Sequence, residues 1–296
     1  MKRKLRLHLN FGFALLMIAI MVIVVGCGTT PAPQTTETPK PANPNLILAT
    51  TTSTQDSGLL DVLIPSFEKK TGYKVQPIAV GTGAALAMGE KGDADVLLVH
   101  AFTSEQKLVD NKTAINYQLV MHNDFVIVGP STDPAKVKGT KTAVDALKAI
   151  AASPSIFVTR GDDSGTDKME KALWTKANIK PAGDKYQSTG QGMGQTLTIT
   201  SEKTAYTLTD RATYLSTKKN LKLDILLEGE TSLLNIYHVM QVNPEKFPKV
   251  NAAGAKAFVD FMIDADTQKL IGSFGKDQYG QALFFADAGK KMEDLN

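Results

Sequence analysis

Short runs of β-branched and aliphatic residues alternate with longer stretches of helical periodicity along most of this chain. The short runs predict strands at 46–49, 74–80, 95–99, 125–128, 156–159, 205–208 and 223–226. The longer stretches predict helices at 57–70, 84–90, 143–152, 167–177 and 194–201. Because strands and helices take turns, we predict an α/β fold with a largely parallel sheet.

An apolar run at 11–25 near the N-terminus does not fit this pattern. It follows Lys2, Arg3, Lys4 and Arg6 and ends in Val24-Val25-Gly26-Cys27. A permanent membrane anchor needs about 20 apolar residues, so the shorter run favours a secretory signal peptide over 1–26. We therefore exclude this segment from the fold.

Cys27 is the only cysteine of the chain, and the four residues that end with it resemble a bacterial lipobox. A lone cysteine cannot form an internal disulfide, and lipidation gives it a role. We expect Cys27 to carry a lipid that anchors the protein to the outer face of a cell membrane. Residues 27–45, rich in Pro and Thr, cannot bury enough apolar surface to fold and are predicted to form a tether.

The net charge of the chain after the signal peptide helps only to exclude one class of partner. Four of the 33 basic residues precede Cys27, which leaves 29 against 30 acidic residues and a net charge of −1. Nothing in this balance favours nucleic acid. About 250 residues follow the tether, enough for one large domain or two modest ones.

Four polar loops follow predicted strands and precede helical stretches. They are Thr50 to Thr54, with five hydroxyl residues in a row, Val80-Gly81-Thr82-Gly83-Ala84, Arg160 to Thr166, and Gly190-Gln191-Gly192-Met193-Gly194. Loops after parallel strands leave from one edge of the sheet, so we expect the four to converge. Hydroxyls, glycine N–H groups and a guanidinium are the donors that a tetrahedral oxyanion needs.

Two Asp-Ser-Gly triplets, at 56–58 and 163–165, each follow a strand and open a helical stretch. Asp and Ser are preferred helix caps, so capping is one reading of both triplets. The free N–H groups of a first turn also attract anions, and the two roles are compatible. Asp162 and Asp163 are expected to turn away from a bound anion.

Other functions are weaker readings of the same residues. No phosphate-binding G-x-x-x-x-G-K motif is present, and GTGAAL and GQGMGQ do not complete G-x-G-x-x-G. A secreted serine hydrolase using Ser164 or Ser57 stays an alternative, although neither serine lies in G-x-S-x-G. His100, His122 and His238 are isolated, so we predict no metal site and no enzyme activity.

Six segments in this order resemble the tungstate-binding lipoproteins of tungstate ABC transporters: ATTTSTQDSGLLDVLIPSFEKKTG, VGTGAALAMGEKGDADVLLVH, NDFVIVGP, FVTRGDDSGTDKMEKALW, GQGMGQTL and AYTLTDRATYL. The resemblance implies a two-lobed periplasmic-binding-protein-like fold (type II) with its ligand in a cleft between the lobes. It implies tungstate as the ligand, no cofactor, and delivery to an ABC permease. Asp167 departs from the family pattern, where a His is expected after Ser-Gly-Thr.

The same resemblance implies the ligand-binding residues. They are Thr51, Thr52, Ser53, Thr82, Gly83, Arg160, Ser164, Thr166, Gly192, Met193 and Gly194. The Arg-x-x-x-Ser-Gly-Thr spacing also resembles phosphate-binding receptors. A molybdate or phosphate receptor of the same fold is therefore the alternative within this class.

The lobes are predicted from where the chain would cross between them. Lobe 1 comprises 46–122 and 244–296, lobe 2 comprises 123–237, and 238–243 returns to lobe 1. The runs 117–123 and 235–243 are predicted to be the hinge strands. Lobe closure would exclude water from the anion and strengthen each hydrogen bond. We expect a monomer.

Overall fold

The computed structural model describes residues 41–295, which pack as one compact unit. The predicted signal peptide, Cys27 and tether residues 27–40 lie outside the described residues. The end of the tether is held by the fold, since Lys74 N donates to Pro44 O at 2.7 Å. Among residues 41–295, no helix combines the length and apolar character that crossing a membrane requires.

Lobe 1 is built on three parallel strands with helices packed against them. The strands are β1 (Asn45–Thr51), β2 (Lys74–Val80) and β3 (Val96–Val99), with β1 between the other two. The helices are α2 (Leu60–Thr71), α3 (Thr82–Lys91), α4 (Phe102–Asp110), α9 (Ala252–Ile263) and α10 (Ala265–Ser273). Phe67 of α2 and Phe258 of α9 are buried against each other, and burial of each such ring contributes about 1.5–3 kcal/mol.

Lobe 2 has shorter strands and a second hydrophobic core. The strands are β5 (Phe157–Thr159), β6 (Tyr186–Ser188), β7 (Thr207–Asp210) and β8 (Asp224–Leu227). The helices are α5 (Ala143–Ala152), α6 (Gly165–Lys176), α7 (Met193–Glu202) and α8 (Arg211–Thr217). Phe157, Trp174 and Tyr206 are buried in the centre of this core.

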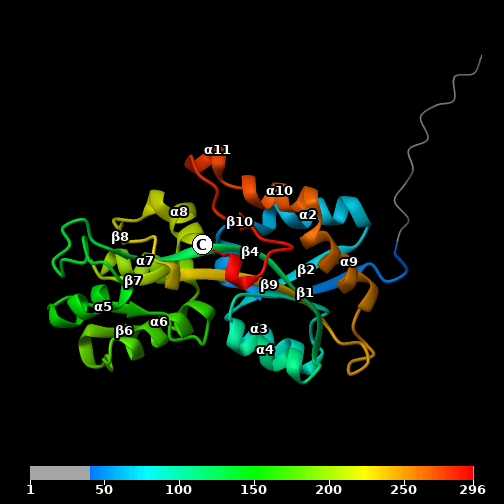
Figure 1. Ribbon diagram of the computed structural model, residues 1–296, viewed down its shortest axis with the longest axis horizontal. Coiled ribbons are helices and arrows are strands. Elements are labelled where there is room, and N and C mark those ends of the chain that lie inside the picture. Colours follow the sequence, from blue (N-terminus) through cyan, green and yellow to red (C-terminus); the bar gives the residue numbers. More distant parts are fainter. Residues whose placement is uncertain (1–40, 296) are drawn as a thin grey trace, which may run out of the picture. The chain divides into compact units, whose positions relative to one another are not determined.

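Two long strands connect the lobes. β4 (Ala114–Gly129) pairs antiparallel with β9 (Leu234–Val242), and the two run side by side between the two groups of helices (Figure 1). β9 also pairs with β3, whereas β4 pairs with β7, β8 and the short β10 (Phe285–Ala286). Of the runs predicted as hinge strands, 117–123 lies within β4, and 235–243 lies within β9 except for Asn243. The residue limits of the lobes stay a prediction.

Two predictions about this architecture are wrong. The main sheet is mixed and not largely parallel, because β4 and β9 pair antiparallel with their neighbours. The predicted helix 57–70 is found as α2, which begins at Leu60. The expectation that Asp56-Ser57-Gly58 opens a helix is wrong, because Ser57 is the C-cap of a short helix that was not predicted, α1 (Thr52–Asp56). Thr51 caps α1 by accepting from Thr54 N, so the hydroxyl run, not Asp56-Ser57-Gly58, begins the first helix.

Candidate functional site

The four polar loops predicted from the sequence lie together where the two lobes meet. Arg160 Nη2 donates to Thr52 Oγ1 at 2.9 Å, and Gly165 N donates to Thr82 Oγ1 at 2.9 Å. Gly83 N donates to Asp163 O at 3.2 Å. Each bond joins lobe 1 to lobe 2. The structure is therefore that of the closed arrangement, with the loops in contact.

Arg160 is the buried cation of this region and is only 1% exposed. Its Nη2 donates to Asp162 Oδ2 at 2.5 Å as well as to Thr52, and its Nε donates to Gln191 O at 3.3 Å. The third nitrogen, Nη1, is buried and has no partner within the protein. A buried guanidinium nitrogen without an acceptor is costly, so Nη1 indicates a place for an acceptor from outside the chain.

Asp162 and Asp163 hold other partners. Besides Arg160, Asp162 accepts from Ser164 N at 3.2 Å, within its own turn. Asp163 adopts a left-handed backbone (φ 58°) and its Oδ1 lies 2.7 Å from Lys168 Nζ. Its side chain is 69% exposed. Asp162 is thus paired with Arg160 and with its own turn, and Asp163 is paired with Lys168.

All predicted hydroxyl ligands except the half-buried Thr52 are buried, and they differ in how many hydrogen bonds they already make. Thr166 Oγ1 has no partner. Ser164 Oγ caps α6 by accepting from Asp167 N at 3.1 Å, and Thr82 Oγ1 accepts from Gly165 N. A hydroxyl that accepts one bond still has its own proton to donate. Thr166, Ser164 and Thr82 can therefore all donate to an oxyanion.

The glycine-rich loops contribute fewer free backbone donors than the sequence suggested. Gly192 is the N-cap residue of α7 and no side chain caps this helix, so the N–H of Met193 points out of its first turn. The N–H of Gly194, however, donates to Asp56 Oδ2 at 2.9 Å, and that of Gly83 to Asp163 O. In the closed arrangement these two donors are already paired inside the protein.

Thr51 and Ser53 are held by a histidine that the sequence analysis did not place in the site. His100 Nε2 lies 3.1 Å from Thr51 Oγ1 and 3.2 Å from Ser53 Oγ, and its Nδ1 lies 2.8 Å from Asn235 Oδ1. Because Asn235 Nδ2 donates to Asn123 Oδ1 (2.8 Å), its Oδ1 is the acceptor, and Nδ1 of the histidine carries the proton. Nε2 then accepts from the threonine or the serine.

Ser53, His100 and Asn235 follow the order of a nucleophile, a base and an orienting group. Burial lowers the pKa of His100 to about 3, so the ring is neutral and too weak a base to remove a hydroxyl proton near neutral pH. Ser164 is a helix cap, and Ser57 Oγ donates to Thr54 O at 2.8 Å. The three residues are better described as a polar scaffold that orients the hydroxyl loop.

The sequence analysis also did not assign the buried carboxyl of Asp210 to the site. Asp210 is the last residue of β7 and caps α8, since its Oδ1 accepts from Thr213 N at 2.8 Å, while Oδ2 is buried without a partner. Burial raises the pKa of Asp210 to about 6, against the attraction of Arg160. The signal was present in Thr207-Leu208-Thr209-Asp210, a polar strand-to-helix junction like the other four.

The relationship to known proteins follows from three comparisons. A family model described as "PBP superfamily domain" matches residues 33–266. The chain belongs to the PBP superfamily. It is 51% identical over 247 residues to the tungstate-binding protein TupA of Peptoclostridium acidaminophilum, which covers 83% of this chain and 86% of the relative.

Two solved structures of the PBP superfamily fold are similarly related. The tungstate ABC transporter structure from Geobacter sulfurreducens is 48% identical, with a TM-score of 0.72, and the match covers 78% of this chain and 98% of that chain. The tungstate-binding protein TupA from Desulfovibrio alaskensis is 47% identical, with a TM-score of 0.68, covering 83% and 99%. The superfamily is one of binding proteins, and the resemblance noted from the sequence is confirmed.

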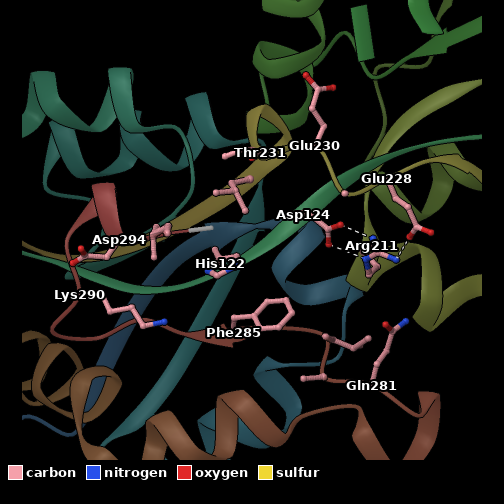
Figure 2. A pocket seen from close by; sticks show the side chains of 15 residues that line it. His122, Asp124, Arg211, Glu228, Glu230, Thr231, Gln281, Phe285, Lys290 and Asp294 are labelled. Atoms are coloured by element: carbon pink, nitrogen blue, oxygen red, sulfur yellow. Dashed lines mark hydrogen bonds and ion pairs between the residues drawn. The ribbon is translucent and has the colours of Figure 1, made fainter. Parts of the chain in front are cut away.

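The PBP superfamily fold of this chain also has a cleft of ≈ 600 Å³ that contains none of the predicted ligand residues (Figure 2). Its lining includes Arg211 and Lys290. Arg211 already holds Asp124 (2.5 Å) and Glu228 (2.5 Å), and Lys290 holds Asp287 at 2.8 Å. Because both cations are paired, this cleft is a poorer anion site than the loops around Arg160.

Proposed function

We propose that this protein is the solute-binding component of an ABC importer and that it captures tungstate between its lobes. The observation that carries the proposal is the pair of buried donors without partners, Arg160 Nη1 and Thr166 Oγ1, at the junction of four donor-rich loops. Relatives named as tungstate-binding proteins support the identity of the ligand.

The site suits a tetrahedral dianion because the oxygens of such an anion accept hydrogen bonds on every side, and the site supplies donors. Arg160 supplies the charge, and Thr52, Thr82, Ser164 and Thr166 supply hydroxyl donors. Thr51 and Ser53 add hydroxyls oriented by His100, and the first turn of α7, with Gly192, Met193 and Gly194, adds backbone dipoles. For Gly83 and Gly194 we propose a supporting role, because their N–H groups are paired across the lobes.

Capture by closure explains why the contacts between the lobes fall within the ligand loops. Thr52, Thr82 and Asp56 of lobe 1 bond to Arg160, Gly165 and Gly194 of lobe 2. An anion that satisfies Arg160 Nη1 and Thr166 adds bonds available only when the lobes meet. The ligand thus stabilises the closed state, which we propose the permease recognises.

A single calorimetric experiment tests the ligand. Tungstate, molybdate, sulfate and phosphate are titrated separately into the purified chain at equal pH and ionic strength. We expect one tungstate per chain and the highest affinity for tungstate. Tighter binding of molybdate or phosphate would identify the alternative receptor of this fold, and no heat with any of the four anions would contradict the proposal.

The serine hydrolase is not favoured as a second function. His100, the histidine beside a buried serine, is held neutral by burial, which removes its value as a base. The family comparisons also point to binding proteins. We therefore propose no catalysis, no cofactor and no bound metal cation for this chain.

We further propose that the receptor is extracytoplasmic and held at the membrane by a lipid on Cys27. Replacing Cys27 with alanine is expected to abolish lipid attachment and to release the protein from the membrane fraction, while tungstate affinity stays the same. Two or more acyl chains are needed for stable anchoring, so losing them changes partitioning clearly. The measurement is incorporation of a labelled fatty acid, and unchanged labelling of the variant would refute this anchor.

A further inference from the structure

The charges around Arg160 do not balance once a dianion is added. Asp162 pairs directly with the guanidinium. Two more carboxyls, Asp56 and Asp210, interact with Arg160 through space. If all three are ionised, these four side chains already carry a net charge of −2. A tungstate dianion would be bound against this negative charge unless a proton enters with it.

Asp210 is the carboxyl best placed to take that proton. Its side chain is fully buried, and Oδ2 has no donor, so the ionised form is poorly solvated. Asp162 already accepts from Arg160 Nη2 and from Ser164 N. Asp56 is only partly buried and accepts from Gly194 N. Protonation of Asp210 would also turn its unpartnered oxygen into a donor, the kind of group that an oxyanion accepts.

The other groups packed around β7 and α8 are less suited than Asp210 to take up the proton. From β9, Tyr237 stays neutral, because burial and the negative charge of Asp210 raise the pKa of its hydroxyl. From β4, Asn123 Nδ2 lies 3.4 Å from Oδ1, and Asp124 is held by Arg211.

The remaining neighbours are carboxyls of α6, which also packs on β7. Asp167 Oδ2 lies 2.5 Å from Lys171 Nζ, and Glu170 accepts from Trp174 Nε1 at 3.0 Å. Both have their own partners. Arg160 and Asp56 thus remain the charged groups that act on Asp210 through space.

From this arrangement we propose that Asp210 takes up one proton from solvent when the anion binds, so that tungstate capture is coupled to protonation. The inference rests on the proposed function. With a pKa of about 6 in the closed arrangement without the anion, Asp210 is mostly ionised at pH 7, and entry of the anion would take up about 0.9 proton per tungstate. Because the bound state holds more protons than the free state, affinity rises as pH falls.

The test is calorimetric titration of tungstate into the purified chain in two buffers of equal pH and different enthalpy of protonation. We expect the apparent heats to differ by the amount that corresponds to about 0.9 proton at pH 7. The binding constant should fall about tenfold from pH 7 to pH 8. Absence of tungstate binding would contradict the proposed function, whereas binding with equal heats in both buffers would overturn only the proton uptake.

Two variants assign the proton to a residue. Asp210→Asn keeps an oxygen that can accept from Thr213 N, and it should bind tungstate with no proton uptake and less than about twofold change from pH 7 to pH 8. Asp56→Asn is the matched control and should retain the uptake. Loss of uptake in Asp56→Asn with retention in Asp210→Asn would overturn the assignment. Should Asp210→Asn fail to fold, retained uptake in Asp56→Asn still supports it, and lost uptake contradicts it.

Discussion

Replacing Arg160 with alanine is expected to weaken tungstate binding about 30-fold to several-thousand-fold. Removing one member of a buried charge pair costs about 2–5 kcal/mol, and 1.4 kcal/mol corresponds to about a factor of ten. Arg160 is 1% exposed and its Nη1 lacks a partner, so it has both the burial and the free donor that this estimate requires. Arg160→Lys should also lose affinity, because an ammonium lacks the planar fork. Calorimetry measures both losses.

The controls separate loss of the ligand contact from loss of structure. Lys168→Ala removes a neighbouring positive charge that is 31% exposed, and its effect should stay within about threefold because water and salt screen such a charge. The double variant Arg160→Ala with Asp162→Asn removes the carboxylate that the single variant leaves without its cation. If the double variant binds tungstate within threefold of wild type, Arg160 is structural and the anion lies elsewhere.

Replacing Gly165 with alanine is expected to weaken tungstate binding about 5- to 150-fold without destabilising the lobe that carries it. A Cβ at this position would lie 2.7 Å from Cε1 and Nδ1 of His100 and 3.0 Å from its carbonyl oxygen. His100 cannot move aside easily, because its ring is bonded to Asn235 and to the Thr51 and Ser53 hydroxyls. Overpacking of this kind costs about 1–3 kcal/mol. In this protein the clash arises only when the lobes close, because Gly165 and His100 lie on different lobes.

The same substitution should leave the unliganded protein as stable as wild type or slightly more stable. Gly165 is the first residue of α6, and alanine is favoured over glycine in helices by up to about 1 kcal/mol. Gly272→Ala in α10 is the matched control, since its Cβ would meet Ala286 Cβ at an ordinary 3.7 Å. It should not change affinity. Wild-type affinity in Gly165→Ala, with thermal unfolding measured alongside, would show that this close contact between the lobes is not needed for binding.

The elements that were predicted well are those whose signals are local. Strand β2 and helix α5 match their predicted ranges, because β-branched runs and helical periodicity are read within a few residues. The two runs predicted at 117–123 and 125–128 proved to be one strand, β4, that crosses both lobes. No local pattern distinguishes a strand that ends from one that continues into a second lobe. The prediction of a largely parallel sheet failed for the same reason, because strand direction depends on which strands become neighbours.

The residues of the candidate site also fall into those that the sequence indicates and those that only the structure reveals. The four donor-rich loops, with Arg160 in one of them, could be inferred from residue types at strand-to-helix junctions. The burial of Arg160 and the pairing of Asp163 with Lys168 are seen only in the structure. His100 and Asp210 could not be assigned to the site, although both follow predicted strands. Their importance comes from burial and from partners far away in the sequence, such as Asn235, 135 positions from His100.

By itself the sequence determined the α/β class, the positions of the polar loops and the family, because periodicity, turn chemistry and ordered motifs are encoded in adjacent residues. Only the tertiary structure decided which of those donors are free. Gly194 gives its N–H to Asp56, 138 positions away, whereas Arg160 Nη1 and Thr166 Oγ1 have no partner. Hydrogen-bond satisfaction and pKa depend on burial and on neighbours brought together by folding, so a list of potential donors becomes a binding site only in three dimensions.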